Sequence, residues 1–366
     1  MPGRSRSQLL SFTPIPAQRK EALGPVLYLG TIPTYSVPTL LAVIKRLEQV
    51  LRAFLWKGSE LSHGGAKVAW VNVCLPFKEG GLGVKRLDTW NQAAMLKHVW
   101  NLCSDRENSI WSSWVWTYLI KRRSFWELKC PGDCSWTWRK ILNLREIARG
   151  KIKYPVGDGR TSRDRIVWAE SPNGKFSIKS AWNSVRHRET VVGWHKLVWF
   201  KNWIPRHAII LWMAIRGKLY TQDKLVSMGI IQINRCVLCK EEEETLDHLF
   251  SSCPFTARIW SLLCDRCALP RSHRRWETNV EWLSRNFSDK SLLSLIVRLM
   301  FAAFVYSLWK ERKMRMQSGK TRRLVQIYLE ILEYVRTRTI YQRNFPRSSA
   351  NIRLVEAWGL TDSICS

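Results

Sequence analysis

The stretch "CVLCKEEEETLDHLFSSCP", residues 236–254, places three thiols and one imidazole within eighteen positions. Cys236 and Cys239 form a Cys-x2-Cys pair, and His248 is followed after four residues by Cys253. Two thiolates on a tight turn, with a His and a Cys about one helical turn apart, can converge on a tetrahedral ion. Four protein ligands leave no open position for water or substrate, so the spacing predicts a structural zinc site and not a catalytic one.

A second Cys pair leaves the choice of ligands open. Cys264 and Cys267 have the same spacing and can replace His248 and Cys253, although the gap of twenty-four residues after Cys239 is slightly long for paired knuckles. Unliganded, buried Cys and His side chains are a further alternative. Carboxylates can bind zinc, but the four consecutive side chains of the acidic run, residues 241–244, point in different directions and cannot all reach one ion. The run is therefore interpreted as a solvated loop, in which Glu243 or Glu244 can contribute to the N-terminus of the helix that follows.

Composition indicates a polyanionic partner. The 366 residues include 59 Lys and Arg against 29 Asp and Glu, which gives a formal charge of +30 and a pI near 10.2. Such a balance favours nucleic acid first and an anionic membrane surface second. The 21 Trp residues cluster in segments such as "SIWSSWVWTYL", residues 109–119. Indole rings can stack on bases, but they fill protein cores more often.

Two segments bear on localisation. The N-terminal "MPGRSRSQLLSFTPIPAQRK" lacks an apolar region followed by a small-residue cleavage site, which predicts an intracellular protein, nuclear or cytoplasmic. In that reducing setting close Cys pairs indicate metal ligands before disulfides. Residues 291–309 are nearly long enough to span a membrane. Arg298 near their centre would cost about 3 kcal/mol there, so we expect a buried helix and no membrane partner.

Periodicity predicts a mainly α protein with small β-hairpin elements (α+β), built around a zinc-stabilised helical domain. An amphipathic helix begins near Thr39, Pro205 suits a helix N-terminus, Gly217 a helix break and Thr221 a helix cap. Asp-Gly and Asn-Gly pairs between alternating runs predict the hairpin region. The expected organisation is a poorly ordered segment 1–29, a helical region 30–150, a β-hairpin region 151–190, a zinc-binding domain 191–270 and a basic helical region 271–366.

The basic run "KERKMRMQSGKTRR", residues 310–323, lies between two long helices expected within residues 291–340. It holds seven Lys or Arg residues and one Glu. A solvated helix end and a phosphate-contacting surface are both compatible with such a run. The residues that would contact nucleic acid are Lys310, Arg312, Lys313, Arg315, Lys320, Arg322 and Arg323.

Catalytic patterns are not found in the sequence. No Ser, Cys or His has a recognisable supporting acid, as nucleophilic catalysis requires. Two-metal polymerase or nuclease chemistry needs grouped carboxylates, and the sequence contains no Asp-Asp pair. These observations predict that the chain is not an enzyme.

Residues 199–260 resemble a known family. This run is similar to the zinc-binding domain that follows the reverse transcriptase in plant non-long-terminal-repeat (LINE-type) retrotransposons. The similar features are the segment "NWIPRHAIILWMAIRGKLYTQDKL" after Trp199, the Cys, Cys, His and Cys described above, and Trp260. Upstream, "RAFLWKG" (52–58) and residues 68–100 resemble the thumb and connection region of those elements, which would occupy residues 30–150.

The resemblance implies a structural zinc held by Cys236, Cys239, His248 and Cys253, and an association with RNA or DNA. It also implies that the polymerase palm, endonuclease and ribonuclease H lie outside this chain. The expectation is therefore a non-catalytic C-terminal fragment of a retrotransposon reverse transcriptase that binds nucleic acid. A retroelement relic with no selected activity, and an accessory piece acting with a reverse transcriptase in trans, are the alternatives. The oligomeric state stays open.

Overall fold

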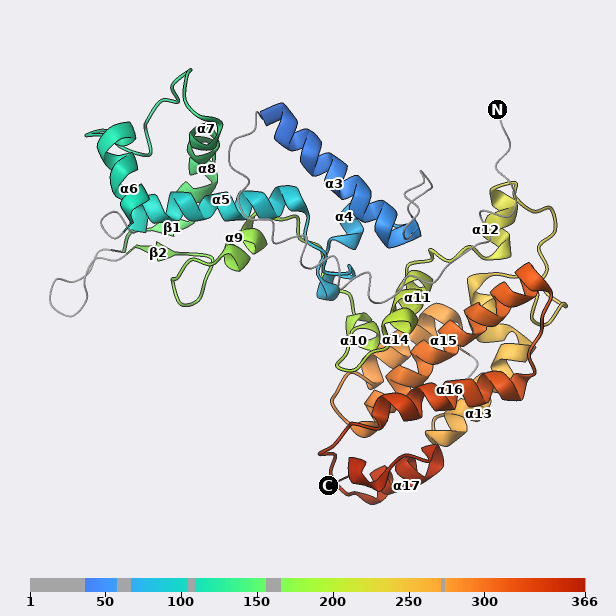
Figure 1. Ribbon diagram of the computed structural model, residues 1–366. Helices are drawn as coiled ribbons and strands as arrows, with labels where there is room; N and C mark the ends of the chain where they lie inside the picture. The colour runs from blue at the N-terminus through green and yellow to red at the C-terminus, as the bar shows by residue number, and fades with distance from the viewer. Residues whose placement is uncertain (1–36, 58–66, 105–108, 156–165, 271–273, 366) are drawn as a thin grey trace. The chain divides into compact units, whose positions relative to one another are not determined.

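The computed structural model describes residues 37–57, 67–104, 109–155, 166–270 and 274–365, with side chains from Ala42 onward. This part of the chain is mostly helical and contains a two-stranded antiparallel sheet, which confirms the mainly α class (Figure 1). It divides into two compact units. The N-terminal unit comprises residues 37–76 and 81–189, and the C-terminal unit comprises residues 77–80 and 190–365. The predicted poorly ordered segment 1–29 lies outside the described residues.

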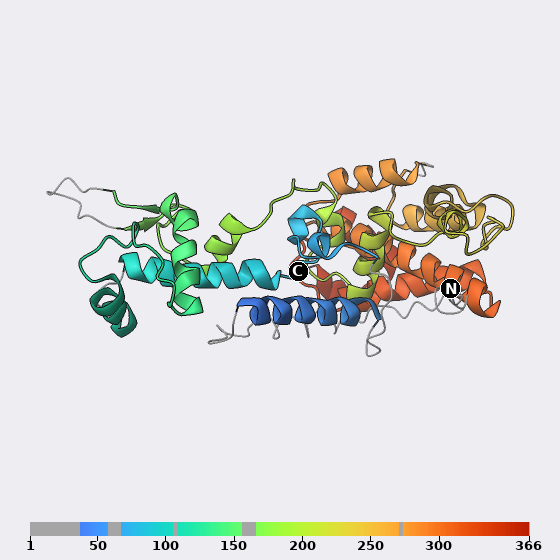
Figure 2. The same cartoon turned by 90° about the horizontal axis from the view of Figure 1, so that it is seen from above.

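Helix α5 is the centre of the N-terminal unit, with α7, α8 and α9 packed against it (Figure 2). The shared core includes Leu96, Val99, Ile141, Trp168 and Ala181. The predicted amphipathic helix near Thr39 is confirmed as α3. The elements of this unit are α3 (Val37–Lys57), α4 (Trp70–Val73), α5 (Leu87–Ser104), α6 (Ile110–Trp114), the π-helical η2 (Val115–Ile120), α7 (Trp136–Asn143), α8 (Arg145–Arg149), β1 (Ile152–Lys153), β2 (Val167–Trp168) and α9 (Ile178–Val185).

The predicted β-hairpin region, residues 151–190, is only partly a hairpin. Strands β1 and β2 pair antiparallel, with Ile152 opposite Trp168. The prediction is wrong for the end of the region, which forms helix α9. The physical reason is a reciprocal cap, because the Ser177 hydroxyl accepts the N–H of Ser180 and the Ser180 hydroxyl accepts the N–H of Ser177. The Asp-Gly turn at residues 158–159 lies outside the described residues.

Helix α15 is the core of the C-terminal unit and is contacted by α11, α13, α16 and α17. The remaining elements are α10 (His195–Val198), α12 (Gln222–Ser227), the π-helical η3 (His248–Ser252), α14 (Trp276–Asn286) and the 3-10 helices η1 (Phe77–Glu79) and η4 (Asp362–Ile364). The main packing helices are α11 (Pro205–Ile215), α13 (Pro254–Arg266), α15 (Leu292–Ser318), α16 (Leu324–Thr339) and α17 (Ser349–Trp358). Both predicted C-terminal regions, 191–270 and 271–366, contribute to this one unit.

The apolar segment 291–309 forms the first part of α15, as predicted. Among the described residues this helix alone is long and apolar enough to cross a membrane, and 94% of its most apolar window is buried inside the protein. Arg298 is accommodated within the unit, because its guanidinium donates to the carbonyl oxygens of Ser294 and Asp289 at 2.8 and 2.9 Å. Burial lowers the pKa of Arg298, but these hydrogen bonds satisfy its charge. Helix α15 is therefore a core helix of the folded unit.

Helix boundaries around α11 and α12 follow the sequence signals, with one correction. Pro205 is the first residue of α11, and Gly217 takes a left-handed φ of 61° after it. Thr221 occupies the N-cap position of α12, but its side chain forms no capping hydrogen bond. The N–H of Gln222 instead donates to a carboxylate oxygen of Glu244 at 2.8 Å. The cap of α12 therefore comes from the acidic run that precedes His248.

Candidate metal centre

The first half of the cluster is a tight turn that carries Cys236 and Cys239. The N–H of Lys240 donates to the carbonyl of Cys236 at 2.8 Å, and Lys240 takes a left-handed φ of 63°. The N–H of Cys236 donates to the carbonyl of Glu242 at 2.8 Å, which closes the loop behind the turn. These bonds hold both thiols on the same side of the chain.

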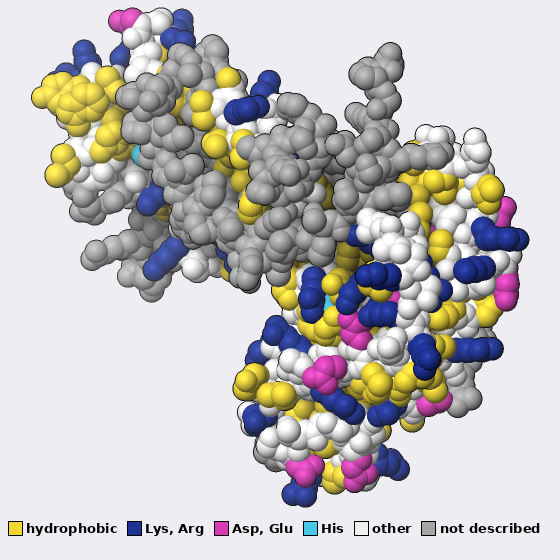
Figure 3. All heavy atoms as spheres, turned by 45° about the vertical axis from the view of Figure 1, so that its right-hand side comes forward, with side chains coloured by type: hydrophobic (Ala, Val, Ile, Leu, Met, Phe, Trp, Pro, Cys, Tyr) yellow, Lys and Arg dark blue, Asp and Glu magenta, His cyan; other side chains and the backbone are white. Residues whose placement is uncertain are grey.

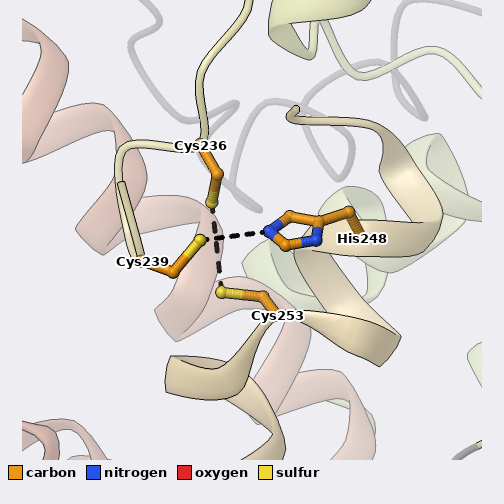
Figure 4. A group of neighbouring side chains, drawn as sticks. All are labelled: Cys236, Cys239, His248 and Cys253. Carbon is orange, nitrogen blue, oxygen red and sulfur yellow. Dashed lines mark hydrogen bonds between the residues drawn. The ribbon is translucent and has the colours of Figure 1, made fainter. Parts of the chain in front are cut away.

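The second half consists of η3 and the start of α13. The N–H of Cys253 donates to the carbonyl of His248 at 2.8 Å, which closes a wide π-helical turn. Cys253 then serves as the N-cap residue of α13, with Pro254 at the first helical position. The two side chains consequently face the Cys236–Cys239 turn (Figure 4).

The four side chains form a compact donor set. Their ligand atoms all lie within 4.8 Å of one another. The sulfurs of Cys236 and Cys253 are 4.0 Å apart, and the Cys239 sulfur lies 3.4 Å from Nε2 of His248. Ligand atoms around a tetrahedral zinc with Zn–S bonds of about 2.3 Å are about 3.8 Å apart, so the arrangement fits one ion. No other group of three or more His, Cys, Asp or Glu ligands is found among the described residues.

The two buried thiols, Cys236 and Cys253, differ in acidity. The neighbouring Cys236 thiol and the backbone N–H groups of Thr256 and Phe255 lower the pKa of Cys253, because they stabilise its thiolate at the start of α13. The hydrogen bond to Cys253 and burial raise the pKa of Cys236. A second buried thiolate next to the first needs a cation, and metal binding at such a site releases protons.

Glu242 orients the histidine. Its carboxylate lies 2.9 Å from Nδ1 of His248. An acceptor at this distance favours the tautomer with the proton on Nδ1 and the lone pair on Nε2, the nitrogen that faces the Cys239 thiol. The hydroxyl of Ser252 is 3.4 Å from the same Nδ1. Sequence reasoning placed Glu242 in a solvated loop and missed this role. The presence of a carboxylate between the two ligand pairs is the sequence signal that could have indicated a hydrogen-bond acceptor for His248.

Residues 176–260 match the family model described as zinc-binding in reverse transcriptase. These residues are therefore similar to the zinc-binding domain of reverse transcriptases, and they are called the zinc-binding domain below. The chain is 22% identical over 372 aligned residues to an Arabidopsis thaliana protein named "Putative ribonuclease H protein". The alignment covers 78% of this chain and 58% of the relative. The chain therefore spans less than two thirds of that relative.

Two uncharacterized mitochondrial proteins of Arabidopsis thaliana also match. One is 26% identical over 132 residues, which is 35% of this chain and 85% of the relative. The other is 34% identical over 79 residues, which is 21% of this chain and 55% of the relative. No solved structure matches the chain. The expected reverse-transcriptase zinc-binding region with plant relatives is confirmed, whereas the thumb and connection region stays a prediction.

The zinc-binding domain is tied to α15 by a buried ion pair. Glu244 is fully buried, and its carboxylate lies 2.7 Å from the guanidinium of Arg312, which is 3% exposed. The same carboxylate oxygen accepts the N–H of Gln222 that begins α12. The solvated-loop prediction is therefore wrong for Glu244. Arg312 lies 68 positions further along the chain, so a local sequence pattern could not identify it as the partner of Glu244.

A second contact fixes the Cys236–Cys239 turn to the same helix. Arg315 donates to the carbonyl oxygens of Val237 and Leu238 at 3.2 and 3.0 Å. Figure 2 shows the loops of the zinc-binding domain beside the C-terminal end of α15. Helix α15 is thus part of the framework that positions the ligands, although the family match ends at residue 260.

The predicted nucleic-acid residues of the basic run differ in their surroundings within the protein. Four of the seven form intramolecular ion pairs: Arg312 with Glu244, Arg315 with Glu311, Arg322 with Glu311 and Glu330, and Lys310 with Glu330. Lys313 is half-buried, and burial lowers its pKa to about 8. Lys320 and Arg323 are exposed. Arg312, Arg315 and Arg322 thus neutralise the buried carboxylates of Glu244 and Glu311, and a contact of the run with nucleic acid stays a prediction.

The alternative ligands Cys264 and Cys267 do not join the cluster. Both are buried at the end of α13. Burial raises the pKa of Cys267 to about 12, so its thiol stays protonated. The structure brings together the four ligands chosen from the spacing and leaves this second pair outside.

Proposed function

We propose that the four side chains hold one structural zinc ion and that the chain is a non-catalytic, nucleic-acid-binding part of a retrotransposon reverse transcriptase. The observation that carries the proposal is the closed donor set of three thiols and one imidazole within 4.8 Å. Thiolate and imidazole ligands suit zinc, and four protein ligands fill its tetrahedral shell. When bound, the ion supplies folding free energy to the loops that carry its ligands.

Two observations support nucleic acid as the partner. The net charge of +30 attracts a polyanion. The name of the relative that aligns with 78% of this chain refers to a ribonuclease, an enzyme of RNA.

The binding proposal predicts a steep salt dependence. The affinity of the full chain for a fluorescent single-stranded RNA should fall by about a hundredfold between about 50 and about 200 mM salt, if five phosphates are contacted. Fluorescence anisotropy measures it. Lys320→Gln with Arg323→Gln should lower the slope of log affinity against log salt by about 1.4, and Lys320→Arg with Arg323→Lys should preserve it. Salt-independent or undetectable binding would favour a relic without selected activity.

The zinc proposal predicts a specific effect at Glu242. Replacing Glu242 with Ala should weaken zinc binding by about 10-fold to 100-fold, because His248 loses the acceptor that fixes its proton on Nδ1. Competition with a chromogenic chelator measures the affinity. Glu241→Ala is the matched control, since its carboxylate lies on the same exposed loop. Equal losses in both variants would show a general charge effect and contradict the positioning role.

A further inference from the structure

An exposed stripe of large apolar side chains runs along α6 and η2 in the N-terminal unit. Ile110, Trp114 and Tyr118 are 93%, 50% and 61% exposed and recur every four residues. The rings of Trp114 and Tyr118 lie 5.7 Å apart with their planes tilted by 36°. Other Trp side chains of this unit, such as Trp138 and Trp168, fill its core. The stripe is therefore not used for packing within the described part of the chain.

The stripe is held on a firmly anchored segment. Val115 and Ile120 on its opposite side are buried in the core, and the indole N–H of Trp116 donates to the carbonyl of Leu102 at 3.0 Å. The N–H of Lys121 donates to the carbonyl of Trp116 at 2.7 Å and closes a π-helical turn. Lys121 itself takes a φ of 58°, which L-residues rarely adopt. Single π turns and such backbone conformations are concentrated at functional sites.

Positive charge adjoins the stripe. Lys121, Arg122 and Arg123 are exposed directly after Ile120, the last residue of η2, and residues 109–126 contain no Asp or Glu. Arg123 donates to the carbonyl oxygens that end η2, whereas Lys121 and Arg122 have no ion-pair partner among the described residues. Figure 3 shows hydrophobic side chains gathered at the upper left, over this part of the N-terminal unit, with Lys and Arg side chains beside them.

We propose that this aromatic-basic face, formed by Ile110, Trp114, Tyr118, Lys121 and Arg122, binds an unpaired strand of RNA or DNA. Exposed aromatic rings stack on unpaired bases, and flanking cations contact the phosphates between them. Charge complementarity favours a polyanionic strand over an apolar protein partner. Bases inside a duplex are already stacked, so the rings cannot reach them. The proposal rests on the proposed function and assigns one part of it to a defined surface.

The test compares single and double strands on the full chain. Anisotropy with labelled oligouridylate, oligothymidylate and a blunt duplex of equal length gives the three affinities. Trp114→Ala with Tyr118→Ala should weaken both single strands by about tenfold or more and leave the duplex unchanged. Trp114→Phe with Tyr118→Phe should retain most of the affinity. Tyr341→Ala, at a ring that is 84% exposed in the other unit, is the matched control and should have no effect.

A measurement on the unaltered chain guards against misfolded variants. Ultraviolet cross-linking to oligouridylate or oligothymidylate, followed by peptide mass spectrometry, should place adducts within residues 109–123. If the unaltered chain and the Ala variant bind the strands with equal affinity, or if adducts form only outside residues 109–123, the assignment of this surface would be overturned. The proposed function would still stand. No strand binding at all would overturn both. Loss of self-association in the Ala variant, with strand affinity intact, would assign the face to protein contacts and overturn the proposal.

Discussion

Removal of zinc should unfold the part of the zinc-binding domain that carries the ligands, which is η3, α13 and the loop before them, and should leave the N-terminal unit folded. Between α12 and η3, residues 228–245 contain no helix or strand, so few backbone hydrogen bonds hold this loop without the ion. This loop and η3 bury few large apolar side chains, mainly Leu238, Leu249 and Phe250. Structural zinc contributes about 10–16 kcal/mol in small zinc-binding peptides, which is as large as the whole unfolding free energy of a typical domain, about 5–15 kcal/mol.

The experiment is chelation of the purified full chain, followed by circular dichroism and hydrogen exchange. Amide protection should be lost in η3 and α13, stay unchanged in α5 and α9, and return when zinc is added. Mass spectrometry should find about one zinc per chain, and Cys236→Ser and His248→Ala should each abolish it. Cys264→Ser alters a buried thiol outside the cluster and should retain the metal. Zinc retained by His248→Ala would show that the ion lies elsewhere.

The ligand set could be predicted because its signal is local. Cys-x2-Cys and His-x4-Cys spacings each lie within one turn of backbone, so the chain between the ligands hardly affects the geometry within each pair. Helices α11 and α15 could also be predicted, because the residues that begin each helix and its apolar side chains are close together in the sequence. Local hydrogen bonding and periodicity determined these elements, and the structure follows them.

Features that depend on distant partners could not be predicted. The pairing of Glu244 with Arg312 joins residues 68 positions apart, and nothing in an acidic run or a basic run identifies the partner. The acidic run was interpreted as a solvated loop, and the basic run as a solvated helix end or a phosphate-contacting surface, because charge predicts exposure unless a counter-charge is buried with it. The Trp-rich segments pose a similar problem, because composition does not distinguish the buried Trp168 from the half-exposed Trp114.

Breaking the buried ion pair should destabilise the C-terminal unit strongly. Glu244→Gln leaves the guanidinium of Arg312 buried without a counter-charge and weakens the acceptor that caps α12. Removing one partner of a buried pair costs about 3–5 kcal/mol, because the remaining charge has lost its hydration. Urea denaturation of the zinc-loaded chain measures the change. Glu281→Gln is the matched control: its partner Arg285 is exposed, so the cost should stay below about 1 kcal/mol.

The double variant Glu244→Leu with Arg312→Met separates charge from packing. If desolvation of the pair offsets its attraction, this variant should recover most of the stability lost in either single variant, since two apolar side chains need no counter-charge. Additive losses would instead show that the two residues act independently, and the buried pair would not be the link between α15 and the zinc-binding domain. When folded, the double variant should keep the salt slope of RNA binding, because Arg312 is enclosed within the unit and contacts no phosphate.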